Sequence, residues 1–282
     1  MIPAEFDYVA PDTLEEALRA LREGGEDAKL LAGGHSLLPL MKLRLAAPSL
    51  LVDLRKVPGL DGIEHANGGW RVGALTPHVA LERTPELGVV SVAAGTIADP
   101  QVRNRGTIGG SLAHGDPAAD LPAVMLITEA SVTLQSQEGT RSVEARELFQ
   151  NYLETAVAPD EVLTEVRIPS LEGWGFGYEK FNRRSEDWAM VAVSVMVKAN
   201  DGQAEDVRVG LTNMGSVPLR AEGVEAALRG QSLSPESIAR AAEQADEGTD
   251  PPADLNASAE YKRHLARVLT RRALERAAGL AS

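Results

Sequence analysis

Short apolar runs alternate with charged amphipathic stretches over the first fifth of the chain. Residues 6–10 and 29–32 are apolar runs of strand length, and residues 14–22 between them place leucines and alanines at helical spacing. A further apolar run covers residues 50–54. The pattern predicts a β-α-β-like unit that ends near Lys56.

The middle of the chain continues with a mixture of strand and helix signals. Thr76-Pro77 is typical of a helix start. The stretch from Asp99 to Asp120 lacks clear periodicity and predicts a long loop, which in a compact domain is more often functional than idle. The other predictions are strands at 70–75, 132–134 and 162–168, a helix at 87–97 and a buried helix at 121–127.

Residues 169–173 predict a boundary, because they combine Pro, Ser and Gly between apolar segments. Beyond it, an antiparallel sheet is predicted at 178–181, 190–198 and 207–211, and helices at 221–229, 235–244 and 261–277. We therefore expect an α+β protein with three regions, residues 1–56, 57–170 and 175–282.

Composition narrows the function classes. The 282 residues carry 28 Lys plus Arg against 41 Asp plus Glu, a net charge of −13, which argues against nucleic acid as a partner. There is no cysteine, so this chain can hold neither disulfides nor an iron–sulfur cluster. The sequence shows no membrane span and no signal peptide, and the cytoplasm is the expected location.

Paired glycines supply the candidate chemistry. Gly24-Gly25 and Gly68-Gly69 are typical of a helix end and a hairpin turn. Gly33-Gly34 and Gly109-Gly110 differ from them because Ser or Thr hydroxyl groups lie nearby. A glycine backbone can approach a ligand with several N–H groups exposed, which suits a pyrophosphate.

The usual catalytic and metal-binding patterns are absent or weak. None of the five histidines has helical metal-ligand spacing, and no Walker loop, Gly-x-Gly-x-x-Gly fingerprint or Gly-x-Ser-x-Gly elbow occurs. Asp116 and Asp120 can be interpreted as an acid–base pair or as caps of the following helix. We predict no catalytic and no metal-binding residue, and favour a protein that holds a cofactor.

Three segments carry a resemblance that covers essentially the whole chain. They are residues 31–44, with Ala-Gly-Gly-His-Ser; residues 106–120, with Thr-Ile-Gly-Gly-Ser; and residues 178–189, with Lys-Phe-Asn-Arg-Arg. In order and spacing they resemble the FAD-binding medium subunits of the molybdenum hydroxylases, of the carbon monoxide dehydrogenase and xanthine dehydrogenase type. Ser111 departs from the pattern, since relatives often carry Asn there, but a hydroxyl group can still donate a hydrogen bond.

The resemblance implies a two-subdomain FAD-binding region of the vanillyl-alcohol-oxidase/PCMH type, formed by residues 1–56 and 57–170, and a C-terminal domain over residues 175–282. FAD would lie between the two subdomains, with its pyrophosphate against the backbone N–H groups of both glycine segments. The residues implied there are Ala32, Gly33, Gly34, His35, Ser36, Leu37, Thr107, Ile108, Gly109, Gly110 and Ser111.

Four further residues are implied at the cofactor, three toward the ribityl chain or the flavin ring and Leu163 in apolar contact with FAD. They are Asp120, Leu163, Lys180 and Trp188. Each also has an ordinary structural interpretation: a helix cap for the aspartate, a buried strand position for the leucine, a solvated surface lysine, and a domain-interface tryptophan. A lysine close to the flavin would stabilise negative charge on the reduced ring and raise its potential.

The resemblance also implies partners. A small subunit with two [2Fe–2S] clusters and a large subunit with the molybdenum cofactor would join this chain, as a dimer of heterotrimers. Electrons would pass through the clusters to FAD and then to an external acceptor such as a quinone, NAD or oxygen. The alternative is a self-sufficient FAD-dependent oxidoreductase of the same fold.

Overall fold

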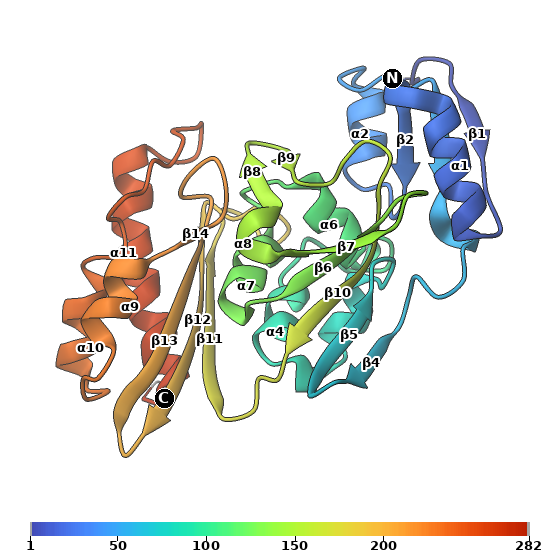
Figure 1. The fold of residues 1–282 in the computed structure, drawn as a ribbon. Helices are drawn as coiled ribbons and strands as arrows, with labels where there is room; N and C mark the ends of the chain where they lie inside the picture. The colour runs from blue at the N-terminus through green and yellow to red at the C-terminus, as the bar shows by residue number, and fades with distance from the viewer. Residues whose placement is uncertain (1, 281–282) are drawn as a thin grey trace.

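The computed structural model describes residues 2–280. Its N-terminal lobe is a three-stranded parallel sheet in the order β1-β3-β2, flanked by two helices (Figure 1). The first helix begins at the predicted place, because the Thr13 hydroxyl accepts a hydrogen bond from the Glu16 amide. The elements are β1 (Asp7–Val9), α1 (Leu14–Gly24), η1 (Gly25–Asp27), β2 (Ala28–Leu31), α2 (Leu37–Lys42), β3 (Leu50–Asp53) and η2 (Leu54–Lys56).

A five-stranded antiparallel sheet forms the centre of the molecule, in the order β4-β5-β10-β6-β7. Gly68 has a φ of 74° and lies in the turn between β4 and β5, and Gly69 is the first residue of β5, so the predicted hairpin turn is confirmed. The strands are β4 (Ile63–Ala66), β5 (Gly69–Gly73), β6 (Ser131–Gln135), β7 (Thr140–Glu144) and β10 (Val162–Pro169).

Short helices pack against this sheet and fill most of the connections. A two-stranded ribbon, β8 (Phe149–Asn151) with β9 (Glu154–Thr155), follows the last of them. The helices are α3 (His78–Glu82), η3 (Pro85–Leu87), α4 (Val89–Gly95), α5 (Pro100–Arg103), α6 (Ile108–His114), α7 (Asp120–Thr128) and α8 (Ala145–Leu148).

The predicted long loop from Asp99 to Asp120 is wrong, because α5 and α6 lie within it. The Asp99 carboxylate caps α5 by accepting from the Val102 amide, and the Thr107 hydroxyl caps α6 by accepting from the Gly110 amide. Two glycines inside a seven-residue helix hide its apolar pattern. The helix predicted at 87–97 is also shorter, since η3 precedes it and it ends at Gly95.

The C-terminal region is a four-stranded antiparallel sheet in the order β11-β12-β13-β14 with three helices on one face (Figure 1). Alternate residues of β12 face opposite sides: Val191, Val193 and Val195 join the core under these helices, whereas Ala192 and Met196 face the central region. The elements are β11 (Trp174–Phe181), β12 (Val191–Asn200), β13 (Gln203–Thr212), β14 (Leu219–Arg220), α9 (Glu222–Leu228), α10 (Pro235–Ala242) and α11 (Ala259–Ala277).

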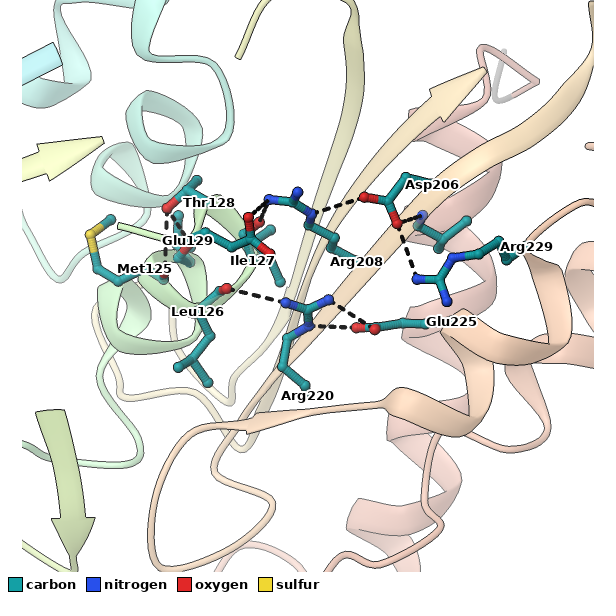
Figure 2. A network of polar contacts seen from close by, with 12 residues as sticks. Met125, Leu126, Ile127, Thr128, Glu129, Asp206, Arg208, Arg220, Glu225 and Arg229 are labelled. Carbon is teal, nitrogen blue, oxygen red and sulfur yellow. Dashed lines mark hydrogen bonds and ion pairs between the residues drawn. The ribbon is translucent and has the colours of Figure 1, made fainter. Parts of the chain in front are cut away.

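Helix α7 joins the central region to the C-terminal sheet. All nine of its residues are buried, and Gly210 of β13 lies so close that an added Cβ would be 2.6 Å from the Ala123 carbonyl oxygen. At its C-terminal end, Arg208 donates to the Ile127 carbonyl at 3.2 Å and Arg220 to the Leu126 carbonyl at 3.4 Å (Figure 2). Cationic groups at this end also complement the helix dipole. The mixture of sheets and helices confirms the predicted α+β class.

Within residues 2–280, no helix combines the length and the apolar character that a bilayer crossing requires.

Candidate functional site

The first glycine segment leaves the C-terminal end of β2 and turns directly into α2. Gly34 has a φ of 79°, a conformation that residues with a Cβ rarely adopt. A Cβ on Gly33 would overlap the carbonyl oxygen of Arg105, so only glycine allows this approach. Both glycines are thus required by the path of the backbone.

Unpaired backbone donors gather in this segment. Within the described chain, the amide groups of residues 33–37 donate to no protein acceptor, whereas Leu38 donates to the Gly34 carbonyl at 3.0 Å. The segment is half-buried apart from His35, which is exposed. Several amide donors in one tight turn form a concave site for an anion such as a diphosphate.

The second glycine segment is built differently from the sequence prediction. Thr107 caps α6, and Gly109 and Gly110 lie in its first turn. The amides of Ile108, Gly109, Gly110 and Ser111 donate to the Thr76 carbonyl, the Ala74 carbonyl, the Thr107 hydroxyl and the Thr107 carbonyl, respectively. The protein's own acceptors use these four amides in this structure, and the predicted role of the segment in anion binding stays a prediction. The Thr107 amide donates to no acceptor in residues 2–280.

Glycine serves close packing in this second segment. A Cβ on Gly109 would lie 2.5 Å from the Ala74 Cβ, so the helix start could not dock on the end of β5. A Cβ on Gly110 would point toward Ala32, 3.7 Å from its Cβ. Together with the contact between Gly33 and Arg105, this brings the two segments side by side, as predicted.

His78, which the sequence reasoning did not single out, lies beside the place where the two glycine segments meet. It is 5% exposed, its amide donates to the Gly106 carbonyl at 2.9 Å, and a Cβ added to Gly106 would lie 2.8 Å from Cδ2 of its ring. Its Nδ1 is buried without a hydrogen-bond partner. Burial lowers the pKa of His78 to about 4, and the charges of His35 and Arg103 act in the same direction.

A second cluster forms where α7 meets β11. Asp120 accepts from the Tyr178 hydroxyl at 2.6 Å and from Lys180 Nζ at 2.9 Å, and Lys180 also donates to the Thr96 carbonyl at 3.0 Å. The side chains of Asp120 and Lys180 are 5% and 6% exposed. Burial raises the pKa of Asp120, and Lys180 and Tyr178 oppose this rise. Burial, followed by the charge of Asp120, raises the pKa of Tyr178.

This cluster excludes the ordinary structural interpretation of two residues, whose place near the flavin stays a prediction. Asp120 is not a helix cap, because Ala119 occupies the cap position and no side chain bonds there. Lys180 is not a solvated surface lysine, because a carboxylate and a carbonyl hold its buried ammonium group. Asp116 does not cap α7 either, because its carboxylate accepts from the Ala118 amide in a turn before the helix.

The other two predicted residues have simpler surroundings. Leu163 is 6% exposed and belongs to the central hydrophobic core. Trp188 lies between β11 and β12 and is 59% exposed, so it is not buried at an interface within this chain. An exposed indole is free to stack on a ligand or a partner.

A groove of about 460 Å³ opens beside the Lys180 cluster. Its walls come from the turn between α4 and α5 and from the end of β11 with the residues after it. The lining residues are Gly95, Thr96, Ala98, Asp99, Pro100, Arg103, Lys180, Asn182, Ser185 and Glu186. Across residues 2–280, no three His, Asp or Glu side chains are grouped so that they could hold a metal ion.

Comparison with known proteins identifies the family. Residues 4–171 match the family model described as the FAD binding domain in molybdopterin dehydrogenase, and residues 176–277 match the CO dehydrogenase flavoprotein C-terminal domain. The chain belongs to the FAD-binding medium subunits of the molybdenum hydroxylases. The resemblance noted in the sequence is thereby confirmed, as is the order of an FAD-binding domain followed by a C-terminal flavoprotein domain.

Relatives match over nearly the full length. The carbon monoxide dehydrogenase medium chain of Hydrogenophaga pseudoflava is 40% identical, with 98% of each chain covered. The 6-hydroxypseudooxynicotine dehydrogenase complex subunit alpha of Paenarthrobacter nicotinovorans is 41% identical, covering 98% of this chain and 96% of the relative.

Solved structures agree. Carbon monoxide dehydrogenase from Hydrogenophaga pseudoflava superposes with a TM-score of 0.96 at 41% identity, and quinoline 2-oxidoreductase from Pseudomonas putida 86 with 0.95 at 33%, each covering 100% of both chains. FAD is accordingly the cofactor of this flavoprotein, an oxidoreductase subunit, and the unpaired amides beside Gly33 fit its diphosphate.

Proposed function

We propose that this chain is the electron-transferring FAD subunit of a three-subunit molybdenum hydroxylase. It would receive electrons from the [2Fe–2S] clusters of a small subunit and pass them to an external acceptor, while a large subunit oxidises the substrate at molybdenum. The near full-length match to medium chains of molybdenum dehydrogenases carries this proposal. A dimer of heterotrimers is the proposed assembly. The cytoplasmic location expected from the sequence stays a prediction.

We further propose which segments of the chain bind the diphosphate of FAD. The unpaired amides of residues 33–37 would hold the diphosphate, and Ala32 and the side chains of His35 and Ser36 would border it. Thr107, Ile108, Gly109, Gly110 and Ser111 would form the opposite wall, with the Ser111 hydroxyl and the Thr107 amide as its donors. Residues 1–56 and 57–170 would thus form the two halves of the FAD-binding region, and residues 175–282 a C-terminal domain.

At the other end of the cofactor, the buried Lys180–Asp120 pair would face the flavin. FAD supplies the redox chemistry when it is bound, and the chain supplies position and electrostatics. Lys180 has three N–H donors, of which Asp120 and Thr96 occupy two. The third is available to an acceptor in the groove. Leu163 and Trp188 would provide apolar contacts.

The proposal is tested by mixing this chain, loaded with FAD, with the iron–sulfur subunit of its complex. The iron–sulfur subunit is first reduced with dithionite and then desalted. Flavin absorbance should bleach rapidly with the reduced partner and stay unchanged with the oxidised partner. The lone chain, given organic substrates of related hydroxylases, should show no bleaching. Substrate-dependent bleaching of the lone chain at a similar rate would instead support the self-sufficient FAD-dependent oxidoreductase.

A further inference from the structure

The turn between α4 and α5 contributes directly to the surroundings of Lys180. The Thr96 carbonyl accepts from Lys180 Nζ at 3.0 Å. Two residues later, Ala98 has a φ of 42°, a left-handed conformation that is unfavourable for a residue with a Cβ. Such backbone persists only where its surroundings hold it in place, and it occurs often at functional sites.

Arg103 of α5 holds this turn. Its Nη1 donates to the Ile97 carbonyl at 2.9 Å and to the Ala98 carbonyl at 3.1 Å. Its Nε donates to Glu82 of α3 at 2.9 Å, on a different edge of the guanidinium group. The Arg103 side chain is only 13% exposed, so these bonds form in a partly desolvated place.

These contacts continue to the buried ammonium group. Glu82 orients Arg103, Arg103 fixes the carbonyls of residues 97 and 98, and the same turn presents the Thr96 carbonyl to Lys180. With Asp120 as its only acceptor, a long lysine side chain could pivot about the carboxylate. The second acceptor, from a different element, fixes the ammonium group in one place.

The groove supports the same assignment. Its lining includes Thr96, Ala98, Arg103 and Lys180. Arg103, the turn that it holds and the lysine therefore border the same space. We propose that Arg103, oriented by Glu82, is a positioning residue that fixes Lys180 against the flavin by holding the Thr96–Ala98 turn. This inference rests on the proposed function, in which Lys180 faces the flavin ring.

The decisive measurement is the midpoint potential of the flavin in the full chain loaded with FAD. Lys180→Met should lower the potential, because a positive charge near the reduced ring is lost. Arg103→Met should lower it in the same direction by a smaller amount. Because both act through one ammonium group, the double variant should match Lys180→Met alone. Arg103→Lys, which keeps a donor on a long side chain, should restore part of the shift.

The control is Arg83→Met, because Arg83 is exposed and next to Glu82, and its side chain makes no hydrogen bond or ion pair in the described part of the chain. The midpoint potential of this variant should equal that of the parent chain. Hydrogen exchange at residues 96–99 gives a readout that needs no flavin, and Arg103→Met should accelerate it. If Arg103→Met does not fold, Glu82→Gln should give a smaller shift of the same sign.

Three results would overturn the inference, and they are distinguishable. In the first, Lys180→Met lowers the potential, whereas Arg103→Met leaves it unchanged although hydrogen exchange at residues 96–99 is faster. This would show that Arg103 does not position the lysine. An unchanged potential in Lys180→Met removes the lysine from the flavin, and with it this part of the proposed function. Additive shifts in the double variant also contradict action through Lys180.

Discussion

At the scale of single residues, Gly33 shows how a close contact between two backbone segments can shape a candidate binding site. Its missing side chain lets the amide-rich turn approach Arg105, and a Cβ there has no room because the obstacle is backbone. The geometry of the turn, more than any side chain, therefore defines the diphosphate site that we propose.

We predict that Gly33→Ala greatly reduces FAD retention. Displacement of the turn from the Arg105 backbone should also lower the free energy of unfolding by about 1–3 kcal/mol, as overpacking typically does. The flavin-to-protein absorbance ratio after gel filtration measures the first effect, and urea denaturation the second.

The matched control for this change is Gly223→Ala in α9. Its added methyl meets the carboxylate end of the Glu247 side chain, which can move, and alanine favours a helix. This variant should keep its flavin and its stability. Full flavin occupancy in Gly33→Ala would show that the turn does not hold the cofactor.

His78 gives a prediction for pH dependence. Its pKa of about 4 in the folded chain lies below the ordinary value of 6.5, so the unfolded state binds the proton more tightly. Stability should therefore fall as pH decreases from 6.5 toward 4, by about 2 kcal/mol between pH 7 and pH 5 from this residue alone. Urea denaturation at both pH values should show a smaller difference for His78→Leu than for the parent chain. Equal differences in both proteins would contradict the low pKa.

At the scale of elements, the sequence predicted those whose apolar period is visible. The strands at β10 and β12 and the helices α1 and α9–α11 were found close to their observed positions. The strand β7 was missed, because Val143 is the one buried residue among its five and no alternation marks it. Helix α6 was missed because it contains two glycines, of which Gly109 allows close packing against Ala74. Local pattern does not report such tertiary contacts.

In the candidate site, too, some residues could be predicted from the sequence and others could not. The first glycine segment was predicted from residue types that act through their own backbone. Arg103, Thr96 and His78 were missed, since their roles come from contacts between distant elements, such as the bond between Lys180 and Thr96, 84 residues apart. Lys180 and Asp120 were named through the family resemblance, and the pairing between them became visible only in the folded structure.

The end of α7 supplies a prediction at this scale. Arg220 bonds both carboxylate oxygens of Glu225, whose side chain is 7% exposed, and also reaches the Leu126 carbonyl (Figure 2). Arg220→Met leaves that buried carboxylate without its cationic partner, with only the Val209 amide still donating to it, and should lower the free energy of unfolding by about 3–5 kcal/mol. Arg229→Met is the control, because Arg229 is 51% exposed where it pairs with Asp206, and it should lose less than about 1 kcal/mol. Similar losses in urea denaturation would mean that burial of Glu225 is unimportant.

At the scale of the whole molecule, the two parts that match different family models share one core. Tyr178, Ala192 and Met196 of the C-terminal sheet are buried in the same cluster as the central helices. Helix α7 crosses between them, with Asp120 bonded to β11 at one end and the arginines of β13 and β14 at the other. The lysine proposed to face the flavin is thus contributed by the C-terminal sheet and held by the FAD-binding part.

This shared core predicts that the full chain unfolds in one cooperative thermal transition, and that a fragment of residues 174–280 does not fold alone. The fragment would expose the apolar face of β12 that α7 covers, together with Lys180 and Tyr178 stripped of Asp120. Calorimetry of the full chain should show a single peak whose calorimetric and van't Hoff enthalpies agree. The fragment should bind a hydrophobic dye and give no peak. Two separate transitions in the full chain, with a fragment that reproduces one of them, would show that the two parts are independent, and the flavin site would then depend on a mobile contact between them.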